Sequence, residues 1–277
     1  MESNRTSVVN VGIIGIYVVG FFLLIAMTPV ALAQTPKSPP TAASYSDTYC
    51  SGFIAEGEIS RTGVVMGAEE GRKKNELVTG DLVYLGDGAM SNLQKGQEVF
   101  IIRPLRKIKN LGTLYSDIAH VRIVDIHGET PVGEIVFSCQ SLVVGDWVIA
   151  PQSRLSPPAR PTGPVDRFSP TAGKAEGQII DSKWHVVQLG QSAIIYLNVG
   201  TNHGVQAGSV LRIYRPASEG ALSVYSREFY TKASNTARFP RQFLGECVVL
   251  QSEESSSTAI ITTSREEIAL GDRVDLQ

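Results

Sequence analysis

YLGDGAMSNLQKGQEVFIIRP (residues 84–104) and YLNVGTNHGVQAGSVLRIYRP (residues 196–216) are two copies of one element, separated by a constant 112 residues. The copies share, without a gap, a Tyr-Leu pair, two glycines, a glutamine, an isoleucine and a final Arg-Pro pair. Similarity within a chain at a fixed offset is the signature of repeated folding units. The chain is therefore expected to contain two related domains, and residues that both copies keep are expected to build the scaffold.

The similarity continues after these stretches, but the offset changes. The sequence VGDWV at 144–148 aligns with LGDRV at 270–274, which is an offset of 126, and Ile135 falls on Ile261 in the same frame. The 14-residue difference predicts that the second copy carries an insertion, which we place in the polar loop 217–241.

Both copies read as β structure. Short runs of β-branched and aromatic residues occur at 82–85, 99–102, 120–124 and 132–137, and Gly, Asp and Asn separate them. No helix is expected outside the N-terminal segment. The fold class is therefore predicted as all-β, with two tandem small antiparallel barrels or sandwiches after an N-terminal signal helix.

The first 33 residues are typical of a signal peptide. Arg5 precedes an unbroken apolar run from Val11 to Met27, and the small-residue site Ala31-Leu32-Ala33 follows. The prediction is export and cleavage, which places the protein in the periplasm or cell envelope of a bacterium. The alternative is that the run is retained as a membrane anchor, which would be its only membrane contact.

Composition then sets the domain boundaries. Residues 34–47 are rich in Pro, Ser, Thr and Ala and are predicted to be a disordered tether. A second Pro-rich stretch, 151–164, is predicted to be a semi-stiff linker that keeps two domains apart, at 48–150 and 165–277.

The charge balance argues against a nucleic-acid partner. The chain has 25 Lys and Arg against 27 Asp and Glu, a formal net charge of −2. Such a chain has no strong positive field to attract nucleic acid. Other envelope proteins are the expected partners, and a cell-wall glycan is a further possibility.

Three cysteines in an exported chain allow one disulfide and one free thiol. We predict a Cys50–Cys139 disulfide, which would tie the N-terminal end to the body of the first domain. Cys247 lies in an apolar run and aligns with Val121, so it is expected to be a buried, inert thiol. The alternative is that all three are free.

The loop inside the repeated element is interpreted as a structural turn. Its members are Gly88, Asn92 and Gly96 in the first copy, and Gly200, Gly204 and Gly208 in the second. Gly204 is replaced by Asn92, and both residue types tolerate a left-handed backbone, so a positive φ is expected there. The next residue, Val205 or Leu93, is expected to plug the barrel, and His203 to be a loop residue and not a ligand.

The second copy resembles a known family at this point. The string from Tyr196 through Gly200, Gly204-Val205 and Gly208 to Arg215 resembles the C-terminal domain of the flagellar assembly protein T family. The same element is similar to one in the C-terminal barrels of the rod-shape protein MreC. This resemblance covers about 25 residues per copy, and it implies a non-enzymatic envelope scaffold built from small β-barrels.

Two basic patches are the candidate partner-binding surfaces. The first follows the repeated element and contains Arg103, Arg106 and Lys107. The second lies in the insertion, where aromatic rings alternate with cations, a composition that suits recognition of a glycan, an acidic peptide or a protein. Its candidates are Tyr225, Arg227, Phe229, Tyr230, Lys232 and Arg238.

No motif for catalysis, a cofactor or a metal stands out. Nucleophile elbows, His-Glu-x-x-His helices and Cys-x-x-Cys pairs do not occur in the sequence. The predicted function is therefore an exported, non-catalytic envelope scaffold or assembly protein that binds other proteins. The alternatives are a peptidoglycan- or polysaccharide-binding module and, third, a hydrolase.

Overall fold

The computed structural model describes residues 40–71, 73–88, 92–160, 163, 166–168, 170, 174–216 and 240–277. The signal segment, residues 34–39 of the predicted tether and most of the insertion lie outside these ranges. Residues from Pro40 to Gln277 form one compact unit. None of the described residues belongs to a helix long and apolar enough to cross a bilayer.

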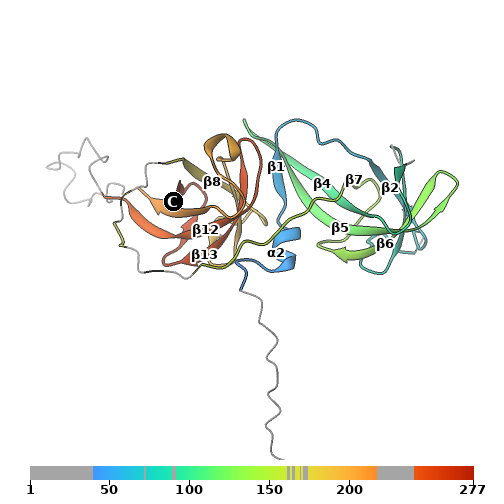
Figure 1. Ribbon diagram of the computed structural model, residues 1–277, viewed down its shortest axis with the longest axis horizontal. Helices are drawn as coiled ribbons and strands as arrows, with labels where there is room; N and C mark the ends of the chain where they lie inside the picture. Colours follow the sequence, from blue (N-terminus) through green and yellow to red (C-terminus); the bar gives the residue numbers. More distant parts are fainter. Residues whose placement is uncertain are drawn as a thin grey trace, which may run out of the picture. The chain divides into compact units, whose positions relative to one another are not determined.

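The first half of this unit is a seven-stranded antiparallel sheet, here called the first barrel (Figure 1). The strand order is β1-β5-β4-β7-β2-β3-β6, and β5 also pairs with β6, so that six strands close into a ring with β1 added on the outside of β5. The strands are β1 (Phe53–Ala55), β2 (Gly63–Ala68), β3 (Leu82–Gly86), β4 (Glu98–Ile108), β5 (Gly112–His127), β6 (Thr130–Ser138) and β7 (Trp147–Ile149).

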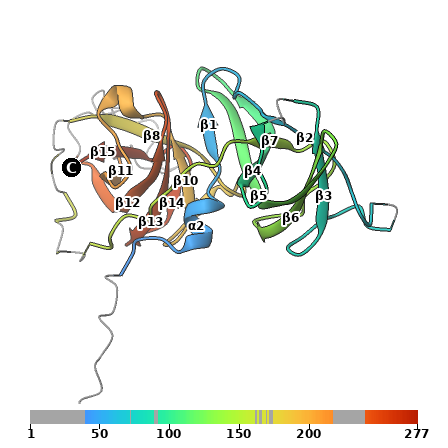
Figure 2. The ribbon, with the colours of Figure 1, turned by 45° about the vertical axis from the view of Figure 1, so that its right-hand side comes forward.

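The second half is a closed six-stranded barrel in the order β10-β13-β12-β11-β15-β8, here called the second barrel (Figure 2). A two-stranded ladder of β9 with β14 and the short 3-10 helix η2 accompany it. The elements are β8 (Glu176–Ser182), β9 (Gln188–Leu189), β10 (Ile194–Leu197), η2 (Thr201–His203), β11 (Val210–Arg215), β12 (Gln242–Ser252), β13 (Ser257–Ser264), β14 (Ile268–Ala269) and β15 (Arg273–Leu276).

The two barrels have the same topology. When the strands are matched by the sequence repeat, β2 to β7 correspond to β8, β10, β11, β12, β13 and β15, and the two rings run through these strands in the same cyclic order. The isolated bridge between Leu77 and Leu142 corresponds to the β9–β14 ladder, where Leu189 faces Ile268. The prediction of two tandem antiparallel β-barrels is therefore confirmed.

The two cores are also built from matching positions. Leu85 and Leu197, like Ile101 and Ile213, are fully or almost fully buried in their respective barrels. Alternate residues of each strand point inward, which is the pattern of a small barrel filled by side chains. Because the inward-facing residues recur at the two repeat offsets, the duplication in sequence is a duplication of the core.

The segment before the first barrel differs from the prediction. It contains a short helix, α2 (Tyr45–Tyr49), although no helix was expected after the signal segment. Ser44 and Asp47 form a capping box at its start, in which each side chain bonds the other residue's backbone N–H. Ala43 is buried against the second barrel and residues 45–49 are helical, so the prediction of a disordered tether is wrong for residues 40–47.

The Pro-rich stretch 151–164 does not act as a spacer in its described part. Thr41 forms a β-bridge with Pro158, and the N–H of Ala42 donates to the carbonyl of Pro157 at 2.8 Å. The side chain of Arg154 is buried, with 7% exposure for the whole residue. This part of the stretch is held against the folded body, because a Pro-rich composition does not reveal which side chains find buried partners.

Candidate functional site

Hydroxyl groups of the second barrel donate to backbone carbonyls of β1 and of the two residues that precede it. The hydroxyl of Tyr196 donates to the carbonyl of Ser51 at 2.8 Å, Thr258 Oγ1 to that of Gly52 at 3.0 Å, and Ser256 Oγ to that of Ile54 at 2.8 Å. Burial raises the pKa of the Tyr196 hydroxyl, which therefore remains a donor at physiological pH. These bonds satisfy the backbone of an edge strand that would otherwise be exposed.

Apolar packing and ion pairs strengthen the same joint between the barrels. Ile54 and Leu114 pack against Tyr196 in one buried cluster. Nearby, the carboxylate of Asp117 receives a two-pronged hydrogen bond from Arg154, at 2.7 and 3.0 Å, and a third from the N–H of Gly52 at 2.8 Å. The carboxylate of Asp117 is therefore fully engaged, whereas the Nε of Arg154 is buried without a hydrogen-bond partner among the described residues.

Arg103, a predicted partner-binding residue, is part of the scaffold. Its Nε and Nη2 each donate to the carboxylate of Asp146 at 2.7 Å. The second barrel repeats this pair with Arg215 and Asp272 at the same two distances. In each barrel the aspartate also accepts the N–H of the residue three positions earlier, at 2.9 and 2.8 Å. Each pair thus anchors the Gly-Asp turn before the last strand, β7 or β15.

Arg106, the second predicted binding residue, contacts the other barrel. Its guanidinium donates to Asp181 of β8 and lies 3.1 Å from the Nδ1 of His185. Burial opposes ionisation of Asp181, but hydrogen bonds from His185, Arg106 and the N–H of Ser182 outweigh it and lower the pKa of the carboxyl group. Arg106 therefore belongs to the joint, where its guanidinium is paired with Asp181.

Lys107, the third predicted partner-binding residue of the first patch, lines an open groove. In the β4–β5 ladder Lys107 faces Thr113 and Pro104 faces Tyr115, whereas Arg106 faces Leu114. Residues opposite each other in a ladder share a face, so Lys107 lies on the face away from the second barrel. The groove has a volume of about 690 Å³ and is lined by Gly57, Glu58, residues 104–110, Gly112, Thr113, Tyr115 and Trp147.

Trp147 was not singled out by the sequence, although it is a prominent part of the groove. It is the first residue of β7, its ring lies 5.9 Å from that of Tyr115, and the guanidinium of Arg61 sits 5.6 Å from its ring centroid. The signal was present in the repeat, because Trp147 aligns with Arg273 and is not shared by the copies. Figure 1 shows the chain after β1 forming an arch above β4 on its way to β2, and Gly57 and Glu58 belong to this connection by sequence.

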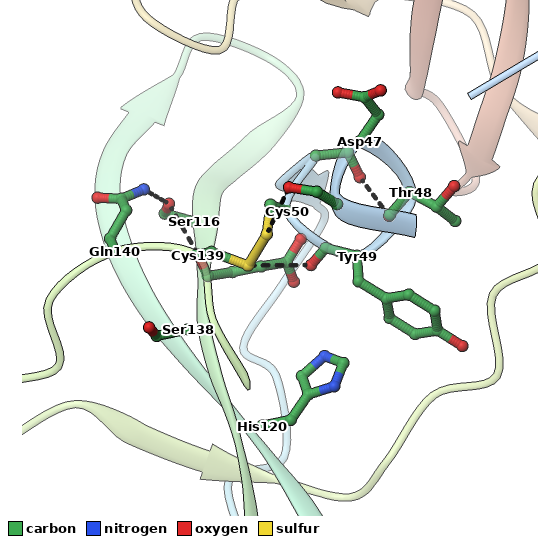
Figure 3. Close-up of a disulfide and its surroundings, with 12 residues drawn as sticks. Asp47, Thr48, Tyr49, Cys50, Ser116, His120, Ser138, Cys139 and Gln140 are labelled. Carbon is green, nitrogen blue, oxygen red and sulfur yellow. Dashed lines mark hydrogen bonds between the residues drawn. A yellow bond between two sulfur atoms is a disulfide. The ribbon is translucent and has the colours of Figure 1, made fainter. Parts of the chain in front are cut away.

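The predicted disulfide is present. Cys50, at the end of α2, is bonded to Cys139, with a Cα–Cα distance of 5.4 Å (Figure 3). The close-up shows Tyr49 extending from α2 toward His120, and the two ring centroids are 5.0 Å apart. His120 also stacks on Phe100 at 3.9 Å. Burial in this aromatic cluster lowers the pKa of His120. The disulfide therefore clamps α2 over a small aromatic core on the outside of the first barrel.

The loop of the repeated element has the predicted character where the structure describes it. Gly204 has a φ of 75°, and the following Val205 is fully buried in the second core. Leu93 occupies the equivalent place in the first core. The Nδ1 of His203 accepts the N–H of Gly200 at 3.3 Å, which completes the turn. Residues 89–91, next to Asn92, lie outside the described part of the chain.

The free cysteine and two of the histidines differ in burial. Cys247 is completely buried, and burial raises the pKa of its thiol to about 12, so it is an inert core residue like its counterpart Val121. His120 is buried and His127 is exposed. Among the described residues, His, Cys, Asp and Glu form no group of three or more that is arranged to hold a metal ion.

The second basic patch is not described. Tyr225, Arg227, Phe229, Tyr230, Lys232 and Arg238 all lie in 217–239, outside the described residues. The end of the loop is seen at Arg241, whose guanidinium lies 4.2 Å from the ring centroid of Tyr214. In the first barrel the equivalent β4–β5 connection carries the groove, so both predicted patches belong to the same hairpin of their respective copies.

In comparisons with known families and curated proteins, no family model matches the chain and no curated protein matches it significantly. The resemblance to envelope barrels therefore rests on the repeated element alone.

Proposed function

We propose that this chain is an exported, non-catalytic component of the bacterial cell envelope that binds other envelope proteins. The observation that carries the proposal is the joint, in which three hydroxyls and the Arg106–Asp181 ion pair unite two barrels. Such a joint stiffens the pair and contributes no reactive groups, as suits a scaffold. The buried Arg154–Asp117 pair fixes the connecting chain to the first barrel. The Cys50–Cys139 disulfide supports an oxidising compartment outside the cytoplasm.

In-cell cross-linking tests the proposal. A photo-reactive amino acid is placed at Leu105, which lines the groove and is 47% exposed, and at Lys95 as a matched exposed position outside the groove. Adducts with envelope proteins are expected from position 105 and not from position 95. Adducts with cytoplasmic proteins alone, or equal adducts from both positions, would contradict it.

The compartment has its own test. Thiols are trapped by alkylation in growing cells, and the protein is analysed by mass spectrometry without reduction. For an exported protein, only Cys247 is expected to be alkylated after unfolding, because Cys50 and Cys139 are joined. A chain with three alkylated cysteines would place the protein in a reducing compartment.

A glycan-binding role is the second candidate, and Trp147 is the observation that favours it. Its ring closes one end of the groove and has a cation beside it, an arrangement that suits a sugar as well as a peptide. Retention of the full chain on purified cell wall, lost in Trp147→Ala and kept in Trp184→Ala, would support the glycan over the protein partner.

A further inference from the structure

The groove of the first barrel follows an open strand edge. All residues from Pro104 to Asn110 line it without a gap. Because side chains of a strand alternate between two faces, a groove that meets every consecutive residue runs along the edge of β4. On this side β4 pairs with β7 only at Phe100 to Ile102, and in the described part of the chain no strand pairs there with residues 103–108.

Trp147 marks the point at which the neighbouring strand stops. It pairs with Ile102, and the preceding residue, Asp146, turns away to bind Arg103. The space beyond Trp147 is therefore the continuation of β7 along β4, and on its far side lies the arch with Gly57 and Glu58. The groove has the position that one more antiparallel strand would occupy.

The charge of the groove selects among possible occupants. Lys107 and Lys109 are exposed, and neither has an ion-pair partner among the residues that the structure describes. Arg61 adds a cation beside Trp147, and Glu58 is the one acidic residue of the lining. Pro104, Leu105 and Ile108 supply apolar surface between the cations. The lining thus complements a segment in which acidic and apolar side chains alternate.

We propose that the β4 edge of the first barrel binds an extended acidic peptide segment of a partner protein as an added strand. The backbone of the segment pairs with β4 beyond Pro104, carboxylates meet Lys107 and Lys109, and an apolar side chain packs on Trp147. This inference rests on the proposed function and names the chemistry of its partner.

A second copy of the chain is a poorer occupant of the edge. Pro104 offers no N–H, and the ladder is irregular between Pro104 and Arg106, features by which natural proteins prevent edge-to-edge pairing. Two copies would also place like-charged lysines side by side. A partner strand of opposite charge avoids this repulsion and pairs beyond the proline.

Peptide selection tests the proposal on the full chain. A phage library of random heptapeptides is panned on the protein, and enriched sequences are expected to alternate acidic with apolar residues. Binding is then measured by tryptophan fluorescence. The chain has two tryptophans, and the Trp184→Phe variant keeps only Trp147. We expect a change in Trp147 emission, and at least tenfold weaker binding when alternate peptide nitrogens are methylated, because methylation removes the donors that pair with β4.

The matched variants are Lys107→Glu/Lys109→Glu and, outside the groove, Lys95→Glu. The double variant is expected to lose acidic peptides at least tenfold and the control to bind normally, with circular dichroism confirming that both are folded. Enrichment of peptides without acidic residues, equal binding to the double variant, or no enrichment at all would overturn the proposal. The proposal would also be overturned if a polygalacturonate oligomer changed the Trp147 emission and the selected peptides did not. That result would assign the groove to an anionic glycan.

These outcomes separate the two proposals. If the peptides fail but position 105 still cross-links to envelope proteins in cells, the added-strand mode is wrong and the scaffold function stands. If the peptides bind but the chain carries three reduced cysteines in cells, the binding mode stands and the envelope function is wrong.

Discussion

Arg154 Nη1 lies 2.7 Å from the Oδ2 of Asp117, and both side chains are buried, with 5% and 7% exposure. Arg154 comes from the Pro-rich stretch and Asp117 from β5, so this pair fixes the chain between the barrels to the first of them. The guanidinium also lies 5.5 Å from the ring centroid of Phe53. A stretch that reads as a linker is thereby built into the core of the joint.

Removing one member of this pair is expected to destabilise the protein strongly. Arg154→Ala leaves the Asp117 carboxylate buried with the N–H of Gly52 as its remaining donor among the described residues, and a broken buried pair costs about 3–5 kcal/mol. Urea unfolding measures the loss. Arg154→Met with Asp117→Leu is the control, because replacing both charges by apolar groups is expected to cost less than the single change. A cost below about 1 kcal/mol for Arg154→Ala would contradict the role of the pair.

The Cys50–Cys139 disulfide is expected to contribute about 2–5 kcal/mol, because it closes a loop with a sequence separation of 89 residues in the unfolded chain. Cys50→Ser/Cys139→Ser should lower the melting temperature and loosen α2 first, which proteolysis near Tyr49 would detect. Cys247→Ser is the contrasting variant. It alters a packed core site and should leave proteolysis of α2 unchanged at temperatures where the protein is folded.

His120 makes stability fall in mildly acidic solution. Burial lowers its pKa in the folded state, and the charges of Asp117 and Glu98 only partly oppose this. The unfolded chain therefore binds a proton more readily, and stability decreases as the pH falls below the unfolded value of about 6.5, by at most about 1.4 kcal/mol per pH unit. His120→Phe should flatten urea-unfolding stability between pH 7.5 and 5, whereas exposed His127→Phe should not.

One glycine position of the loop, Gly88 in the first copy and Gly200 in the second, has no room for a side chain. A Cβ on Gly200 would lie 2.2 Å from the carbonyl oxygen of Glu253, and one on Gly88 1.9 Å from that of Thr62. Gly200→Ala should therefore prevent normal folding of the second barrel. Gly204 has a positive φ and open space around it, so Gly204→Ala should cost only about 1 kcal/mol. Equal melting temperatures for the two variants would refute this reading.

The matched pairs Arg103–Asp146 and Arg215–Asp272 should contribute similar free energies to the stability of their barrels. Each arginine is partly exposed, and each aspartate is buried and keeps a backbone donor. Arg103→Met and Arg215→Met should each lower the free energy of unfolding in urea by about 1–2 kcal/mol. This cost is smaller than for a fully buried pair because solvent reaches the guanidinium. Lys95→Met, on an exposed turn, should cost almost nothing. A large difference between the unfolding free energies lost in the two variants would show that the two copies do not stabilise this turn equally.

Much of the fold was predictable from the duplication. Val121 aligns with Cys247, and both are fully buried, so the copy comparison identified a core site from an unlike pair of residues. The same comparison placed the turn at Gly204. It worked because inward-facing positions of a small barrel are dictated by the local alternation of strands and by turns, which are visible in sequence.

The joint and the groove were less predictable, since they depend on contacts between distant residues. Tyr84 and Tyr196 look equivalent, yet the Tyr196 hydroxyl reaches Ser51 across the joint. Arg103, Arg106 and Lys107 form one basic patch in sequence but have three different surroundings in the fold. Ser44 and Asp47 do carry a local capping signal, but the Pro- and Ala-rich composition around them favours a tether.

The hydroxyl bonds to β1 also constrain the order in which the protein is made. Thr258 and Gly52 are separated by 206 residues, and Ser256 and Ile54 by 202. Because the chain is synthesised from its N-terminus, β1 emerges long before β13. Until then the outer carbonyls of β1 face water or a chaperone, so the joint closes as one of the last events of biogenesis. Truncation after β12 would leave β1 as an open edge strand, and chaperones and proteases would recognise the truncated protein at that edge.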